Sequence, residues 1–250
     1  MPQDAPLPPG NWGFGLFSPT HLLVLAILAV GIAVLVVAYK RASAPVRRRL
    51  QLTFGWTTLM LEVLRQIGIA AQGLYDPSYI PLHLCAMAEF VIFVDCLHSS
   101  RWTREPLYAL GIWGATCALV FADWTNRPIF NIYSWQAFLI HACIVGYILM
   151  RLVAGEIVPT WRNLWRVVIV MGCFVGVAAW ANAVFGTDFW YLATGSPGSP
   201  LEPIQNMTGA YYIPALAVLL IILWVIMYTP WGLHARHVTK AEKALAAPVS

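Results

Sequence analysis

Charged residues are scarce in this 250-residue sequence: Lys, Arg, Asp and Glu together make up only 10% of the chain, against about 25% in soluble domains. With 60% apolar residues, this scarcity excludes a soluble globule and is typical of a polytopic membrane protein, whose solvent is the bilayer. The net charge is +4, but no stretch combines a basic patch with polar, aromatic-interleaved sequence. Nucleic-acid binding is therefore not expected.

Basic residues are absent before Lys40, so the sequence lacks the positively charged start of a secretory signal peptide. We therefore expect the first apolar run to remain as a membrane span. The five cysteines all lie within apolar runs, and no two have the CxxC spacing of metal ligands. Neither a disulfide framework nor a metal site is expected, and the preferred interpretation includes no cofactor.

Seven apolar runs are long enough to cross a hydrocarbon core of about 30 Å, which takes roughly 20 helical residues. The sequence therefore predicts an all-α membrane fold, a bundle of seven transmembrane helices. A short outer segment, 1–18, precedes the transmembrane domain, 19–231, and a basic tail, 232–250, follows it. The spans are expected at about 19–39, 51–74, 79–98, 106–124, 132–154, 164–186 and 210–231.

The positions of the basic residues predict how the bundle is oriented. Thirteen of the 15 Lys and Arg residues, Arg151 among them, fall in the first, third and fifth linkers and the tail. Arg127 alone falls in the other linkers, and Arg65 lies within a span. Because basic residues in short loops stay cytoplasmic, this asymmetry predicts an outer N-terminus and a cytoplasmic C-terminus. The longest linker, 187–209, would then lie outside, as a lid or as a simple connection.

Ionisable side chains within membrane spans are costly, so each needs a partner or a function. Asp95 lies near the inner end of its span, where we expect it to reach the interface as an anchor. Glu62, Arg65 and Gln66 share one helix face through their i, i+3 and i+4 spacing. They either neutralise one another or present Arg65 to a lipid phosphate or carboxylate. Glu89, one turn beyond Cys85, is an alternative partner for Arg65.

Cys85 and His141 are the candidate nucleophile and base. Both fall in the outer half of the predicted bilayer, at a depth similar to that of Arg65. A thiol in an apolar environment needs a nearby base or positive charge to become a thiolate. Packing is the alternative explanation for either residue. His83 is two residues from Cys85 and is expected to face elsewhere, toward a neighbouring span. No oxyanion-hole donor can be assigned from the sequence, because the backbone amides of a regular helix are already used.

Three segments of the sequence form a recognisable pattern: Tyr-Ile-Pro-Leu-His-Leu-Cys at 79–85, the His141 span with Gln136, and the stretch 182–192 that begins at Asn182 and precedes a Gly-Ser-Pro turn. In these segments the sequence resembles the YwaF-like family of bacterial integral membrane proteins, which is similar to the eukaryotic transmembrane protein 164 family. The resemblance covers about residues 17–231. Asp188 and Phe189 depart from the Asn-Tyr pair expected at these positions.

The bacterial family implies a protein of the bacterial plasma membrane. The eukaryotic relatives are described as acyltransferases that act on ether phospholipids with a Cys nucleophile and a His in a later span, so the resemblance also implies a multi-span lipid enzyme. Cys85 and His141 match those two positions. The resulting interpretation is a thiol-dependent acyltransferase with membrane lipids as its substrates or ligands. The residues expected to bind substrate or to support the site are Arg65, Glu62, Glu89, His83, Gln136 and Asn182.

Two other functions remain open at this point. A non-enzymatic transporter or ligand-binding protein would use Glu62, Arg65, Glu89 and His141 as a buried polar network. A haem protein would draw on His21, His83 and His141 as axial ligands, although no accompanying motif is present. The sequence does not specify the acyl donor, the acceptor or the oligomeric state.

Overall fold

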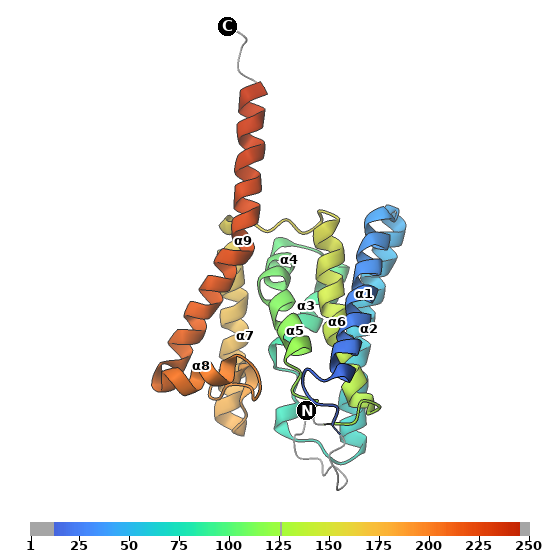
Figure 1. Cartoon of the computed structure of the whole chain (residues 1–250), viewed down its shortest axis with the longest axis vertical. Coiled ribbons are helices and arrows are strands. Elements are labelled where there is room, and N and C mark those ends of the chain that lie inside the picture. The colour runs from blue at the N-terminus through green and yellow to red at the C-terminus, as the bar shows by residue number, and fades with distance from the viewer. Residues whose placement is uncertain (1–12, 126, 246–250) are drawn as a thin grey trace.

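The computed structural model describes residues 13–125 and 127–245, and this part of the chain is helical and contains no β-strand. Nine α-helices are joined by turns, loops and five short helices of 3-10 or π type (Figure 1). The α-helices are α1 (Pro19–Arg41), α2 (Ala44–Ala71), α3 (Leu84–Leu97), α4 (Arg101–Pro106), α5 (Ile112–Val120), α6 (Ile132–Val153), α7 (Leu164–Phe185), α8 (Leu201–Thr208) and α9 (Tyr212–Leu245). The short helices are η1 (Pro77–Tyr79), η2 (Leu107–Gly111), η3 (Trp161–Asn163), η4 (Phe189–Tyr191) and η5 (Gly209–Tyr211).

Within the described residues, four helical segments are long and apolar enough to cross a membrane: Pro19–Arg41, Ile132–Val153, Trp161–Phe185 and Leu201–Leu233. They coincide with the first, fifth, sixth and seventh predicted spans, and the all-helical membrane fold is thereby confirmed. The second predicted span, in α2, carries several charged residues, the third is shortened to the 14 residues of α3, and the fourth is divided between α4, η2 and α5. The count of seven spans and the direction of the termini stay predictions.

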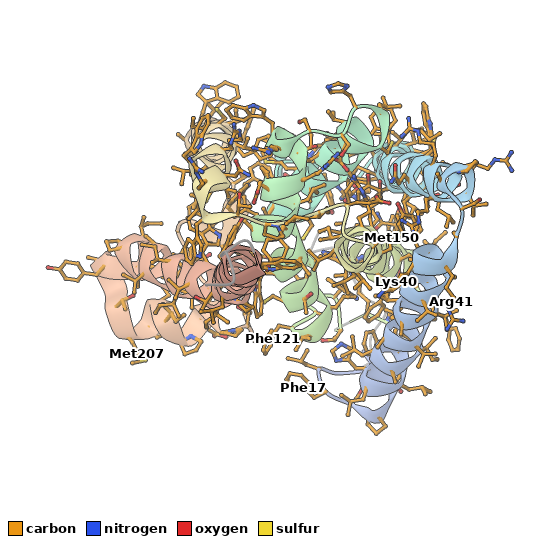
Figure 2. The ribbon with its side chains drawn as sticks, turned by 90° about the horizontal axis from the view of Figure 1, so that it is seen from above. Phe17, Lys40, Arg41, Phe121, Met150 and Met207 are labelled. Atoms are coloured by element: carbon orange, nitrogen blue, oxygen red, sulfur yellow. The ribbon has the colours of Figure 1, made fainter. Side chains whose placement is uncertain are left out.

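The long helices lie roughly side by side, and α1 and α9 flank the remainder (Figure 1). In the view from above, α1 and α9 are on opposite sides of the layer that contains α5 and α6 (Figure 2). The closest packing joins α2 to α3 and α1 to α6, while α9 has its main contacts with α8 and η5. The helix α9 continues past the predicted span end at 231. The tail's basic side chains and most of the predicted outer segment 1–18 lie outside the described residues.

A π-helical turn interrupts the fourth predicted span. Pro106 has no backbone N–H to donate within the helix, and the five residues that follow it form the π-helix η2. Such turns leave backbone carbonyls that need other partners. Here the indole Nε1 of Trp224 in α9 donates to the carbonyl of Ala109 at 3.1 Å, and Tyr108 donates to the carbonyl of Met227 at 2.8 Å. The π-helical turn η2 is thus where hydrogen bonds join α9 to the remainder of the bundle.

A buried ion pair holds α3 to α6, and it corrects two expectations. The carboxylate of Asp95 pairs with Arg151 and accepts hydrogen bonds from Tyr147 and Ser99, both at 2.7 Å. Arg151 also donates to Glu156 at 3.0 Å. Asp95 is only 1% exposed and Arg151 2%, so Asp95 is not an interfacial anchor, and Arg151 is not a loop cation. The two expectations were wrong because Asp95 and Arg151 are far apart in the sequence, and the sequence gives no sign that they form a pair.

Gly55 allows α2 and α3 to approach closely, and this gives a first testable prediction. A Cβ at this position would lie 2.9 Å from Cys96 Cβ and closer still to its sulfur. Overpacking of this kind costs about 1–3 kcal/mol, so we expect Gly55→Ala to lower the midpoint of thermal unfolding in detergent. Gly31 in α1 is the matched control, because a Cβ there meets no described atom within 4 Å. Equal midpoints for the Gly55→Ala and Gly31→Ala variants would contradict the close α2–α3 contact.

Candidate active site

A cavity of about 460 Å³ lies among α2, α3, α5, α6 and α9, and the connection between α7 and α8 also contributes to its wall. Its lining combines apolar side chains with a small group of ionisable ones, as in most small-molecule sites. Seven of the eight residues singled out from the sequence line this cavity: Glu62, Arg65, His83, Cys85, Glu89, Gln136 and His141. The structure therefore brings together residues from three separate segments of the chain: α2, the start of α3, and α6.

Cys85 occupies the first turn of α3, not the interior of a helix. The third span was expected to be helical from residue 79, but α3 begins at Leu84 with His83 as its N-cap. Pro81 explains the late start, because proline disfavours helical geometry in the residue before it. The first amide of α3 to bond a helix carbonyl is that of Met87, which donates to His83 at 3.0 Å. The amides of the preceding turn, Cys85 included, are the orphan donors of a helix N-terminus.

This position supplies candidates for the oxyanion-hole donors that the sequence left unassigned. No side chain of the described chain caps α3 at His83, so the first-turn amides remain for other acceptors. Together with the positive end of the helix dipole, such amides stabilise a thiolate or an oxyanion placed beside them. The start of α3 thus offers Cys85 hydrogen-bond donors for a negative charge, which the interior of a regular helix does not.

His141 has a defined tautomer and a defined ring orientation. Its Nδ1 lies 2.7 Å from the carbonyl oxygen of Ala137, one turn earlier in α6. A carbonyl only accepts hydrogen bonds, so Nδ1 carries a proton, and in the neutral ring Nε2 then keeps its lone pair. The indole of Trp124 stacks on the imidazole with ring centroids 5.3 Å apart and an interplanar angle of 17°. The ring of His141 is therefore oriented by a backbone carbonyl, and Nε2 of the neutral imidazole is available as a base.

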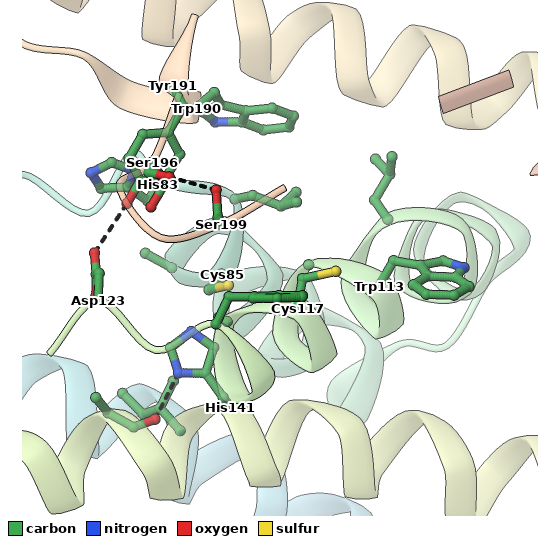
Figure 3. Close-up of a pocket in the computed structure, with 18 of the residues that line it drawn as sticks. His83, Cys85, Trp113, Cys117, Asp123, His141, Trp190, Tyr191, Ser196 and Ser199 are labelled. Carbon is green, nitrogen blue, oxygen red and sulfur yellow. Dashed lines mark hydrogen bonds between the residues drawn. The ribbon is translucent and has the colours of Figure 1, made fainter. Parts of the chain in front are cut away.

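The close-up of the cavity shows how the candidate groups face one another (Figure 3). The sulfur of Cys85 and the ring of His141 point into the same part of the cavity, and Cys117 of α5 lies beside them (Figure 3). Cys117 is thus a second thiol in the lining of this cavity. Because two thiols share this space, Cys117 is the natural internal control for Cys85.

The polar cluster on α2 pairs within itself. Arg65 donates through Nε and Nη2 to the two carboxylate oxygens of Glu62, at 2.8 and 2.7 Å. Gln66 donates to Glu62 at 2.6 Å and to the carbonyl of Tyr79 at 2.7 Å. Of the two arrangements that the sequence left open, the structure contains the internal ion pair. None of the bonds that Arg65 makes within the described chain uses Nη1, the nitrogen that a phosphate oxygen would need.

Asn182 has a structural position outside the cavity lining. Its side chain donates to the carbonyl of Phe189 at 3.1 Å and accepts from the Phe189 amide at 2.7 Å. Asp188 accepts from the amides of Ala193 and Thr194 at 2.9 and 2.8 Å. These bonds fix the start of the connection between α7 and α8, so the two residues shape this connection and do not contact the Cys85 region.

The same connection is attached to the segment before Cys85. The indole of Trp190 donates to the carbonyl of Leu82 at 2.8 Å, and the ring of His83 packs edge-on against Phe189 at a centroid distance of 5.0 Å. His83 was expected to turn away from the site. It lines the cavity instead, because the chain at 80–83 is not helical and the helical spacing from Cys85 does not apply.

Asp123, Tyr191 and the two serines Ser196 and Ser199 also line the cavity, and they were missed from the sequence. Tyr191 donates to Asp123 at 3.2 Å (Figure 3). Burial raises the pKa of the Tyr191 phenol, and the Asp123 carboxylate raises it further, so Tyr191 stays a neutral donor at physiological pH. Asp123 lies in a loop without a motif, whereas Tyr191, Ser196 and Ser199 lie in the 182–192 stretch and the Gly-Ser-Pro turn that follows it. Only the fold brings these side chains to the cavity of Cys85.

His21 is not available as a haem ligand. Its Nδ1 accepts from the amide of Phe17 at 3.1 Å, and its Nε2 lies 3.0 Å from the carbonyl of Leu119. Both ring nitrogens are therefore engaged with the backbone. Among the described residues, no group of three or more His, Cys, Asp or Glu side chains is arranged to hold a metal ion.

Comparison with known proteins gives one match. The model of the TMEM164 family matches residues 16–228, most of the chain and all of the residues that line the cavity. No curated protein and no solved structure matches the sequence. The transmembrane protein 164 part of the resemblance is thus confirmed, while the bacterial YwaF-like part stays a prediction.

Proposed function

This chain belongs to the TMEM164 family of membrane proteins, and we propose that it is a lipid acyltransferase with Cys85 as nucleophile and His141 as base. The observation that carries the proposal is the position of the Cys85 thiol. It lies at a helix N-terminus, in one cavity with a histidine whose Nε2 keeps its lone pair. Nucleophile, base and base-orienting group are the elements that covalent acyl transfer requires.

In the first half of the proposed reaction, His141 Nε2 takes the proton of the Cys85 thiol, and the sulfur attacks the ester carbonyl of a phospholipid. The carbonyl oxygen becomes an oxyanion, which the first-turn amides of α3 stabilise. The carbon–oxygen ester bond then breaks, and the leaving lysolipid oxygen takes the proton from His141. The products are a thioester on Cys85 and a lysophospholipid.

In the second half, a hydroxyl group on an acceptor lipid attacks the thioester. Its proton passes to His141 Nε2, the carbon–sulfur bond breaks, and the Cys85 sulfur takes the proton back. Arg65 offers Nη1 to a substrate phosphate while Glu62 holds the remainder of the guanidinium. The leucines of α9 that line the cavity, Leu219, Leu220 and Leu223, are suited to contact acyl chains.

The proposal places the cavity in the outer half of the bilayer, with the connection 187–209 outside and the α1–α2 turn in the cytoplasm. Ala193 and Ser43 are exposed positions in these two segments. We expect an impermeant maleimide to label the Ala193→Cys variant in intact cells, and the Ser43→Cys variant only after the membrane is opened. Unmodified protein gives the background from the native cysteines. Labelling of Ser43→Cys in intact cells would reverse the orientation.

The activity itself is tested with purified protein in vesicles that contain a phospholipid with a labelled acyl chain. We expect the label to appear on the protein and, when a lysophospholipid is added, on the newly formed phospholipid. A protein that binds lipid without chemistry would change neither. Label that stays in the donor at high protein concentration, with the protein shown to be folded, would remove the acyltransferase proposal.

A further inference from the structure

Glu89 carries a buried carboxyl group that the proposed reaction has not yet used. The residue is 2% exposed and lines the cavity. Its Oε2 has no hydrogen-bond partner among the described residues. A buried polar atom left in this state costs about 1–3 kcal/mol, and such groups in a cavity are suited to a ligand.

The guanidinium of Arg65 makes its ion pair with Glu62 and not with Glu89, and the proposed reaction gives its remaining nitrogen, Nη1, to a substrate phosphate. Arg65 binds both oxygens of Glu62, so that pair is neutral without Glu89. A carboxylate buried here would be an uncompensated charge, and the neutral acid is the less costly form. In this form Glu89 has an O–H that donates and a carbonyl oxygen that accepts.

The helix places Glu89 beside the acyl group that Cys85 would carry. The two residues are at i and i+4 on α3, so their Cβ atoms are about 5–6 Å apart on one face. Side chains on a helix lean toward its N-terminus, which directs the Glu89 carboxyl back toward the turn of Cys85. The first-turn amides are at the N-terminal end of α3, and Glu89 follows Cys85 by one turn toward the other end of the helix. In the proposed arrangement the oxyanion faces these amides and the acceptor lies next to Glu89.

We propose that Glu89 binds the hydroxyl group of the acyl acceptor, a lysophospholipid, for the second half of the reaction. The O–H of Glu89 donates to the acceptor oxygen, and the acceptor's own O–H points to His141 Nε2. The oxygen is then held for attack on the thioester carbon. Glu89 keeps its proton throughout, so His141 remains the group that moves protons. This inference rests on the proposed acyltransferase function.

Two substitutions separate the hydrogen bond from the packing of the side chain. Glu89→Gln retains a donor of nearly the same shape, whereas Glu89→Leu fills the space without one. Removing a buried unpartnered polar group is close to neutral for folding, and thermal unfolding in detergent checks this for both variants. The measured quantities are the rate at which labelled acyl-enzyme forms from the donor and the rate at which a lysophospholipid discharges it.

We expect Glu89→Leu to form the acyl-enzyme at the wild-type rate and to discharge it to lysophospholipid about 100-fold more slowly, the scale of a misplaced nucleophile. Glu89→Gln should discharge it within a few-fold of wild type. A lysophospholipid whose hydroxyl is methylated should not discharge any of the three proteins, because it has no hydroxyl proton to give up; this control shows that the hydroxyl is the attacking group.

Three other results would count against this inference. Discharge of Glu89→Leu at the wild-type rate would show that Glu89 does not bind the acceptor, and the acyltransferase proposal would stand. If Glu89→Leu is folded but forms no acyl-enzyme, Glu89 acts in the first half of the reaction and not in binding the acceptor. Absence of acyl-enzyme in the wild-type protein would overturn both proposals together.

Discussion

Cys85→Ala is expected to lose at least about 1,000-fold in acyl transfer, which corresponds to about 4 kcal/mol of transition-state stabilisation. The substitution removes the group that forms the thioester, and the remaining cavity groups have no equivalent position at a helix N-terminus. Folding should lose only about 1 kcal/mol, because one sulfur atom is removed. The assay is transfer of a labelled acyl chain from phospholipid to lysophospholipid in vesicles.

Cys117→Ala is the matched control for this variant. Cys117 lines the same cavity, but it lies within α5, whose interior amides are bonded along the helix. We expect Cys117→Ala to keep activity within about threefold of wild type. If the two alanine variants lose activity to the same extent, or if Cys117→Ala loses more, Cys85 is not the nucleophile. The transport or ligand-binding function would then be the better explanation of the polar residues.

Arg151→Ala is expected to cost about 3–5 kcal/mol in stability, the range measured when one partner of a buried ion pair is removed. It leaves the Asp95 carboxylate buried without its cation. Thermal unfolding in detergent measures the effect. Arg162→Ala is the control, because Arg162 is an exposed cation in η3 and should change the stability by less than about 0.5 kcal/mol.

A double variant distinguishes the ion pair from packing. Replacing Asp95 by Leu and Arg151 by Met removes both charges at similar volume, and such replacements are often neutral. We expect the double variant to be more stable than Arg151→Ala. If Arg151→Ala unfolds at the wild-type temperature, Asp95 and Arg151 do not form a buried pair, and the contact between α3 and α6 must have another basis.

The sequence predicted the long apolar helices well, because the hydropathy of a membrane span depends only on the residues within that span. Helices α1, α6 and α7 lie within a few residues of the expected spans. The start of α3 was missed, although Pro81 was a visible signal that the helix would begin after it. Because α3 begins at Leu84 and not at residue 79, Cys85 lies in the first turn of the helix. Its thiol is therefore near backbone amides that no helix carbonyl accepts, whereas the sequence alone assigned it no oxyanion-hole donor.

Contacts between distant segments could not be read from the sequence. Asp95 meets Arg151 across 56 residues, and the stacking of Trp124 on His141 depends on how the loop after α5 folds back. The carbonyl of Ala137 that orients His141 is a backbone group, for which no side-chain pattern exists. The sequence identified the chemical groups of the site by residue type, and the packing of helices decided which of them face the cavity.

The most direct test is to locate the acyl group on the protein. Purified protein would be mixed with a labelled phospholipid without acceptor, stopped with acid, digested and analysed by mass spectrometry. The account predicts an acyl group on the Cys85 peptide that neutral hydroxylamine removes, as expected of a thioester, and none on the Cys117 peptide. Acyl transfer that proceeds with no modified Cys85, or with the acyl group on Cys117, would contradict it.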